Sequence, residues 1–254
     1  MGIKTIIKKQ KLNIDKLKDR FFYNDVIYNE QIINFYRESE PDLKKTTINW
    51  RIYSLVQMVV LNRIGRGKYI LGNKQNFIPE IHPKLIKLDR LLKKNFPFLN
   101  YCLWSTSLFN EFMLHQPGKF FFIVEVENDA ADSVFYFLKE SKYSVFLKPD
   151  KDLLNRYLPE DKVVWIIKSL VSESPVQNIK GIQTTTLEKL LVDLFTDTDI
   201  LDAQQGAEKD RIFKEAFDKY IINENKLLRY AARRRKKEQI NNYLNKVSKY
   251  RQQT

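Results

Sequence analysis

The chain has 254 residues, of which 43% are hydrophobic and 30% charged, and its formal net charge is +13. This composition is typical of one or two folded domains and excludes an extensively disordered chain. The single cysteine, Cys102, excludes an intrachain disulfide, and the sequence contains neither a CxxC pair nor an HExxH helix that would indicate zinc.

No apolar run approaches the roughly 20 residues that a membrane-spanning helix needs. The first 20 residues carry charges where a signal peptide has its apolar segment. We therefore expect a cytoplasmic protein without a membrane partner.

Basic residues are concentrated at the two ends of the chain. Residues 1–75 contain 15 Lys and Arg against 7 Asp and Glu, and residues 226–254 contain 10 against 1. The middle of the chain, residues 76–225, contains 19 against 23. Two basic ends around a mildly acidic middle favour two surfaces that meet a polyanion or an acidic partner.

Residues 1–75 have the pattern of a winged helix-turn-helix domain. Apolar side chains at helical spacing predict helices over 12–23 and 28–38, and Pro41 with Asp42 ends the second helix. A third helix follows, capped by Thr46 or Thr47. Its apolar face is predicted to consist of Ile48, Ile52, Leu55, Val56 and Val59.

The third helix leads into a basic hairpin, in which Gly65 and Gly67 supply positive-φ positions. Polar and aromatic side chains on the outer face of such a helix reach bases and phosphates, and the hairpin adds cations. The alternative is a purely structural helix and hairpin with a solvated outer face. The residues that we expect to contact DNA are Lys44, Lys45, Thr47, Asn49, Trp50, Arg51, Tyr53, Arg63, Arg66 and Lys68.

Residues 76–254 are predicted to form a second domain of mixed α/β structure. After a helix over 83–95, apolar strands alternate with helices, which indicates a sheet covered on both faces. The predicted strands are 99–104, 119–126, 144–147 and 162–167, and the helices between them are 107–115, 130–141 and 152–157. Helices over 185–196, 207–222 and 226–247 complete the chain. The fold class is therefore α+β, with an N-terminal winged helix-turn-helix, a mixed α/β domain and C-terminal helices.

The last predicted helix is strongly basic around one apolar edge. Its cations either contact nucleic-acid phosphates, or bind an acidic protein partner, or form a solvated tail. The residues concerned are Arg229, Arg233, Arg234, Arg235, Lys236 and Lys237.

Catalytic signatures are few. No GxSxG elbow, Walker A loop or GxGxxG follows a strand, and Cys102 in its apolar strand is interpreted as an inert core residue. Lys189 and Asp193 are spaced as an (i, i+4) ion pair on a helix surface. We expect no enzyme, no cofactor and no metal site. The alternative is a metal-dependent nuclease or nucleotidyltransferase, whose carboxylates at a strand end would be Glu125, Glu127 and Asp129.

Two stretches carry a resemblance to a known family. WRIYSLVQMVVLNRIGRGKYIL, residues 50–71, is similar to the recognition helix and wing of the AbiEi-type antitoxins of type IV (AbiE) toxin–antitoxin systems, and GIQTTTLEKLLVDLF, residues 181–195, resembles a strand and helix of their C-terminal domain. The resemblance implies a bacterial transcriptional regulator that binds double-stranded DNA at its own promoter. It also implies a partner, a nucleotidyltransferase-like toxin that the antitoxin counteracts. The C-terminal domain would then be an interaction module for that toxin.

Overall fold

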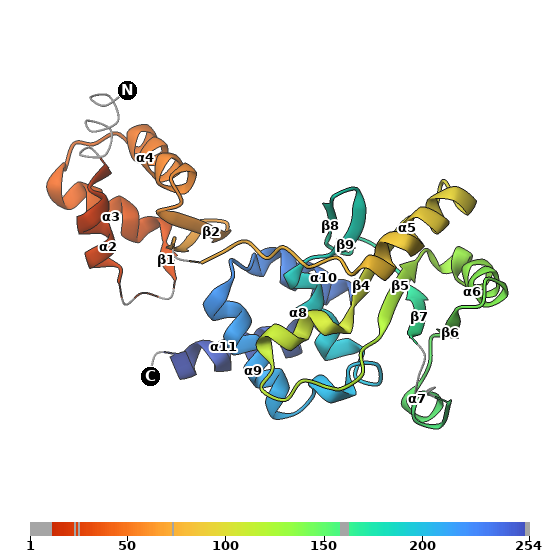
Figure 1. The fold of residues 1–254 in the computed structure, drawn as a ribbon. Helices are drawn as coiled ribbons and strands as arrows, with labels where there is room; N and C mark the ends of the chain where they lie inside the picture. Colours follow the sequence, from red (N-terminus) through yellow and green to blue (C-terminus); the bar gives the residue numbers. More distant parts are fainter. Residues whose placement is uncertain (1–11, 23, 25, 73, 158–162, 252–254) are drawn as a thin grey trace. The chain divides into compact units, whose positions relative to one another are not determined.

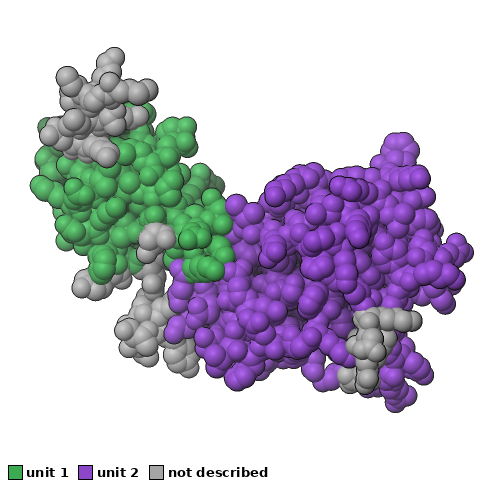
Figure 2. Space-filling model, viewed as in Figure 1, with its two compact units in different colours: residues 1–76, 219–225 green, residues 77–218, 226–254 purple. Residues whose placement is uncertain are grey.

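The computed structural model describes residues 12–22, 24, 26–72, 74–157 and 163–251. The chain divides into two compact units (Figure 2). Unit 1 comprises 1–76 and 219–225, and unit 2 comprises 77–218 and 226–254. Residues 219–225, predicted within the C-terminal domain, belong to unit 1. Residues 1–11, part of the segment whose charges argue against a signal peptide, lie outside the described residues.

The described part of unit 1 contains three helices and a small antiparallel sheet. Strand β3 lies between β1 and β2 and pairs with both. In chain order the elements are α2 (Ile14–Arg20), β1 (Ile27–Tyr28), α3 (Asn29–Ser39), α4 (Lys45–Gln57), β2 (Leu61–Gly65) and β3 (Lys68–Leu71) (Figure 1).

Helical spacing of apolar residues explains the core of unit 1. On α4, Ile48, Ile52 and Leu55 are buried, and they pack with Ile32 of α3 and Leu17 of α2. These three positions of α4 confirm its predicted apolar face. The predicted threonine cap is wrong, because α4 begins at Lys45 and no side chain caps it. Val59 was predicted on the buried face, but it follows the helix in a left-handed backbone conformation and is exposed.

The segment 219–225 returns from the C-terminal part of the chain and is bonded to unit 1. The amide of Gln75 donates to the carbonyl of Lys219 (3.1 Å), and the amide of Ile221 donates to the carbonyl of Gln75 (2.9 Å). Glu224 of the same segment forms an ion pair with Lys68 of β3 (3.6 Å). Unit 1 is therefore assembled from two separate parts of the sequence.

Unit 2 is built on a mixed four-stranded sheet of order β4-β5-β7-β6. Strand β4 runs antiparallel to β5, whereas β5, β7 and β6 are parallel. The strands are β4 (Tyr101–Ser105), β5 (Phe122–Val126), β6 (Ser144–Leu147) and β7 (Val164–Ser169), and the accompanying helices are α5 (Pro83–Asn95), the 3-10 helix η1 (Thr106–Phe112), η2 (Asn128–Ala130), α6 (Ala131–Glu140) and α7 (Lys151–Tyr157). The predicted mixture of strands and helices is confirmed, although residues 107–112 form a 3-10 helix and not an α-helix.

The two faces of this sheet differ in chemistry because side chains alternate along each strand. One face carries Phe122, Val124 and Trp165, which pack with the leucines of α5 and with α6. The opposite face places Glu125 beside Lys168, since these two residues are paired in the β5–β7 register. Helix α8 (Leu187–Thr196) supplies the partners of these charges.

The C-terminal part adds one hairpin and several helices. The hairpin strand β8 was not predicted from the sequence. The elements are β8 (Val176–Ile179), β9 (Ile182–Thr185), η3 (Asp202–Gln204), α9 (Ala207–Lys219), α10 (Glu224–Arg233) and α11 (Lys237–Arg251). Thr186 caps α8 by accepting a hydrogen bond from the amide of Lys189 (3.4 Å).

The single basic helix predicted over 226–247 is wrong, because the chain breaks it between α10 and α11. Arg235 adopts a left-handed conformation with φ of 56°. The amide of Lys236 bonds to the carbonyl of Ala231 (2.8 Å), and the amide of Arg235 bonds to the carbonyl of Ala232 (3.0 Å). These two bonds form a Schellman motif, which ends a helix.

Across the described ranges, no helix combines the length and the apolar character required to cross a membrane.

Candidate functional site

Helix α4 exposes a face of polar and aromatic side chains. Trp50 is 47% exposed and Tyr53 is 62% exposed, and Asn49 lies exposed beside them. Lys44 and Lys45 are exposed where the helix begins, and Thr47 is half-buried. Because the opposite side of α4 is fixed in the core, these side chains are presented on a rigid element. Large aromatic and amide side chains at such positions are suited to base edges and sugar–phosphate surfaces.

Arg51 was predicted on this exposed face, and that placement is wrong because its side chain is buried. Its guanidinium forms two hydrogen bonds with the carboxylate of Glu40, at 2.7 and 3.0 Å, and lies over the ring of Tyr36. Arg51 is buried because its position on α4 turns it toward α3. Its role in the described structure is to join α4 to the end of α3.

We expect replacement of Arg51 by Met to destabilise unit 1 by about 2–3 kcal/mol, because a bidentate ion pair with one buried partner is lost. Urea unfolding of the variant would measure this loss. An unfolding free energy equal to that of the wild type would contradict this role of Arg51.

The β2–β3 hairpin carries the second predicted set of cations. Its two-residue turn is Arg66 and Gly67, and Gly67 has φ of +68°, a conformation that favours glycine. Arg63 and Arg66 are exposed, and the Nε of Arg63 donates to the carbonyl of Gly65 (3.1 Å). Lys68 is partly exposed despite its ion pair with Glu224. The hairpin therefore brings three cations together around one tight turn.

The basic C-terminal residues do not form one continuous surface. Arg233 pairs with Glu173, and the guanidinium of Arg234 bonds to Asp197 (2.6 Å) with Asp193 nearby (3.4 Å). Arg234 is thus engaged inside unit 2, where its side chain is 14% exposed, and it does not belong to a solvated basic surface. The remaining members of the predicted set are Arg229, Arg235 and Lys237, which are exposed, and Lys236, which is half-buried.

The three carboxylates of the alternative metal site are not gathered in the structure. Glu125 is buried on β5, whereas Glu127 is exposed and accepts a hydrogen bond from Asn100 (2.5 Å). Asp129 is exposed in η2. Strand β5 ends at Val126, so Glu127 lies outside the strand that carries Glu125. Within the described residues, no group of three metal-ligating side chains is found.

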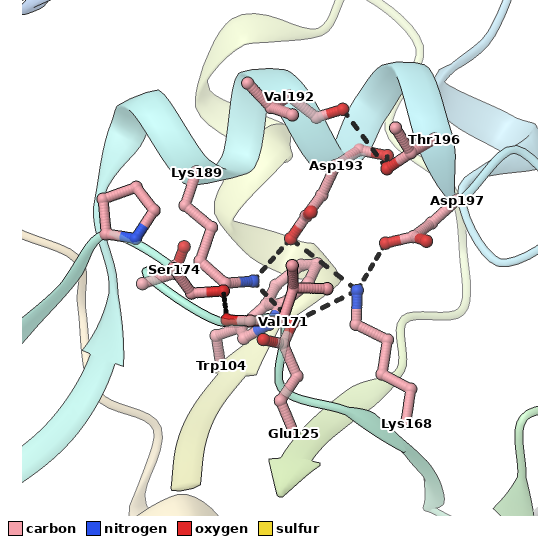
Figure 3. A network of polar contacts seen from close by, with 12 residues as sticks. Trp104, Glu125, Lys168, Val171, Ser174, Lys189, Val192, Asp193, Thr196 and Asp197 are labelled. Atoms are coloured by element: carbon pink, nitrogen blue, oxygen red, sulfur yellow. Dashed lines mark hydrogen bonds and ion pairs between the residues drawn. The ribbon is translucent and has the colours of Figure 1, made fainter. Parts of the chain in front are cut away.

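Glu125 instead belongs to a buried network of charges between β5, β7 and α8 (Figure 3). Its Oε1 lies 2.6 Å from the Nζ of Lys189 and 3.1 Å from the Nζ of Lys168, and it accepts from the indole of Trp104 (2.9 Å). Lys189 also bonds to Asp193 (2.5 Å). The prediction of a surface pair between Lys189 and Asp193 is therefore wrong, because both side chains are fully buried.

The network continues toward α10. Tyr230 donates its hydroxyl to Asp193 (2.9 Å), and Lys168 lies 3.7 Å from the same carboxylate. Asp197, which follows α8, bonds to both Lys168 and Arg234. Three carboxylates, two ammonium groups and one guanidinium thus neutralise one another. We name Glu125, Lys168, Lys189, Asp193, Asp197 and Arg234 the charge network.

The charges hold one another in the ionised state. Burial alone would lower the pKa of Lys168, but the carboxylates of Asp193, Glu125 and Asp197 outweigh burial and raise it. The pKa of Lys189 is likewise raised against burial, by Asp193 and Glu125. For Asp193, burial would raise the pKa, whereas Lys168, Lys189 and Arg234 hold it below its ordinary value. Lys168, Lys189 and Asp193 are therefore charged at neutral pH.

This gives the charge network a defined pH dependence. The lowered pKa of Asp193 contributes stability that is present above its ordinary value of 3.8 and is lost as pH falls through the folded-state value. The raised pKa values of the lysines contribute stability that is present below pH 10.5 and is lost only at higher pH.

We expect the difference in unfolding free energy between the wild type and Asp193→Asn to be constant from about pH 5 to about pH 9 and to shrink below about pH 4. Denaturant titrations across this range would measure it, and a difference that varies between pH 5 and 9 would contradict it.

Sequence reasoning found some members of the network and missed others. Lys168 was not singled out from the sequence. Its position directly after an apolar strand could have indicated a buried lysine that needs a charged partner. Trp104 and Tyr230 were not singled out either, and both are buried and donate hydrogen bonds to the charge network. Cys102, which faces the network, is buried as predicted, and burial raises the pKa of its thiol.

Comparison with known proteins identifies a family. The model of a family of unknown function, DUF6577, matches residues 47–250. The chain belongs to the DUF6577 family. The match takes in α4 from Thr47 onward, the hairpin and the whole charge network of this DUF6577 chain. The sequence matches none of the curated proteins with which it was compared.

Proposed function

We propose that this DUF6577 chain is a DNA-binding transcriptional regulator whose unit 1 is a winged helix-turn-helix domain. The observation that carries the proposal is the exposed face of α4, which runs directly into a hairpin bearing Arg63, Arg66 and Lys68. The order of helix, strand, two helices and hairpin, with β1 as third strand, supports the same interpretation.

In the proposed mechanism α4 is the recognition helix. It enters the major groove with Asn49, Trp50 and Tyr53 toward base edges, and Lys44 and Lys45 contact phosphates. The hairpin cations bind the adjacent backbone or minor groove. Occupancy of a promoter would then repress transcription.

We further propose that the chain represses its own promoter and counteracts a nucleotidyltransferase-like toxin through unit 2. The likeness of residues 50–71 and 181–195 to AbiEi-type antitoxins supports this role. Co-expression with the product of the neighbouring gene tests it: the chain should relieve growth inhibition by that product. An unrelieved inhibition would remove the antitoxin role and leave the DNA-binding role standing.

The DNA-binding role is tested by fluorescence anisotropy on a duplex from the region upstream of the gene. We expect the full chain to bind, with affinity falling steeply as salt rises from about 50 to about 300 mM. Replacing Arg63, Arg66 and Lys68 together by Ala should weaken binding to all duplexes, because each phosphate contact contributes about 0.9 to the salt slope. The slope should therefore fall by up to about 3.

The matched control removes three exposed cations from α5 in unit 2, by Lys84→Ala, Lys87→Ala and Arg90→Ala. This variant has the same net charge as the hairpin variant. An equal loss of affinity in both variants would show that net charge alone drives binding, and an unchanged salt slope in the hairpin variant would exclude the hairpin as the contact.

A further inference from the structure

Unit 2 contains a cavity at the carboxyl ends of two parallel strands. Its volume is about 350 Å³. Lys168 and Ser169 end β7, Lys148 directly follows β6, and all three line the cavity. In open α/β sheets ligands bind outside the carboxyl ends of the strands, so this position is a place where a small molecule is expected. The volume lies within the range of small-molecule sites.

The cavity exposes one end of the charge network. Lys189 and Asp193 have side chains that are 0% exposed, and they form its sealed end. The side chains of Lys168, Asp197 and Arg234 are 10%, 13% and 14% exposed and line the cavity. At this open end two cations share one carboxylate.

Further donors surround the two cations. Lys148 and Ser169 both donate to the Oδ1 of Asn128, at 3.0 and 2.8 Å. Lys148 has φ of 43°, a left-handed conformation that a non-glycine residue rarely adopts and that often marks a functional position. Thr196 and Thr198 also line the cavity. Its lining thus contains three cations against two carboxylates, Asp197 and the exposed Asp199.

Stability alone does not account for such an arrangement. Buried ion pairs are often no more stabilising than well-packed apolar residues of similar volume, because desolvation offsets their attraction. The network is buried at Lys189 and Asp193 and reaches the cavity at Lys168 and Arg234. This arrangement fixes the two cations in position to bind an anion in the cavity. Arginine and lysine pre-positioned in this way bind phosphate oxygens strongly.

We propose that this cavity is a binding site for a terminal phosphate group, with Lys168 and Arg234 at its floor and Lys148 at its rim. A terminal phosphate has nearly two negative charges and three acceptor oxygens, which match three cations and neighbouring hydroxyls. The group belongs either to a small phosphorylated metabolite such as a nucleotide or to the end of a nucleic-acid strand. The site lies in unit 2 and does not depend on the DNA-binding role proposed for unit 1.

Isothermal titration of the full chain with AMP, with inorganic phosphate and with a 5′-phosphorylated oligonucleotide tests the proposal. We expect saturable binding of at least one of them. Lys148→Gln should weaken that binding about tenfold or more, because one charge-assisted hydrogen bond to phosphate is lost. Lys148 is exposed, so this variant should fold normally. Lys87→Gln, at an exposed lysine of α5, is the matched control and should bind as the wild type.

The two sources of phosphate give different results. Binding of AMP would assign the site to a small molecule. Binding of the 5′-phosphorylated oligonucleotide beyond its 5′-hydroxyl counterpart, without binding of AMP, would assign it to a strand end. Absence of saturable binding by all probes, or binding that Lys148→Gln leaves unchanged, would overturn the proposal. The Arg63, Arg66 and Lys68 variant should bind AMP normally, which separates this result from a failure of DNA binding.

Discussion

Replacing Asn49 and Trp50 of α4 by Ala should lower affinity for the specific operator by about 10- to 100-fold, since a good base contact contributes about 1–3 kcal/mol of discrimination. Affinity for unrelated duplex DNA should change much less, because the hairpin cations and the two lysines at the start of α4 are retained. The operator is first obtained by selection from a randomised duplex library with the wild-type chain. Competition binding then measures the ratio of specific to non-specific affinity.

The expected fall in specific affinity requires that Asn49 and Trp50 lie on the solvent-exposed side of α4. Both substituted side chains are exposed, so their removal should leave the stability of unit 1 nearly unchanged. The matched control removes an exposed amide and an exposed aromatic ring elsewhere in unit 1, by Asn34→Ala on α3 and Phe22→Ala after α2. If the control lowers the specificity ratio as much as the α4 variant, α4 is not the recognition helix. A ratio that is unchanged in both variants leads to the same conclusion.

Helical spacing predicted the core of unit 1 well and predicted its surface less well. Ile48, Ile52 and Leu55 were identified because apolar residues that recur at these intervals are typical of the buried face of a helix. Arg51 was assigned to the wrong side, since a long basic side chain on the edge of an apolar face can either extend to solvent or pair inward. Glu40, its partner, lies 11 residues earlier, and this separation has no periodic signature in the sequence.

The charge network illustrates the same limit in unit 2. Lys189 and Asp193 are four residues apart on a helix, which in most proteins is a surface pair. Their burial follows from Glu125 and Lys168, which the sheet register brings together from 43 residues apart. Strand order and register decide such contacts, and apolar pattern does not reveal them. The break between α10 and α11 could not be predicted either, because the basic run at 233–237 contains no glycine or proline that would indicate the end of a helix.

The buried position of Lys189 leads to the largest stability effect that we expect. Lys189→Met removes one ammonium that bonds to both Glu125 and Asp193 and leaves the charge network with one excess negative charge. The expected loss of unfolding free energy is about 3–5 kcal/mol, because an uncompensated buried charge is costly. Urea unfolding at neutral pH measures this loss. Lys151→Met, which removes a lysine from an exposed pair with Asp202, is the control and should unfold as the wild type does.

A second substitution distinguishes a loss of charge balance from a simple packing defect. Glu125→Gln removes one negative charge while keeping an acceptor for the indole of Trp104 and for Lys168. In the Lys189→Met background this change restores neutrality, so the double variant should be more stable than the sum of the two single losses predicts, by at least about 1 kcal/mol. Additive losses would mean that the charges act independently and would contradict the coupling described here. If adding Glu125→Gln to Lys189→Met raises the unfolding free energy, charge balance within the network stabilises the packing of α8 against the sheet.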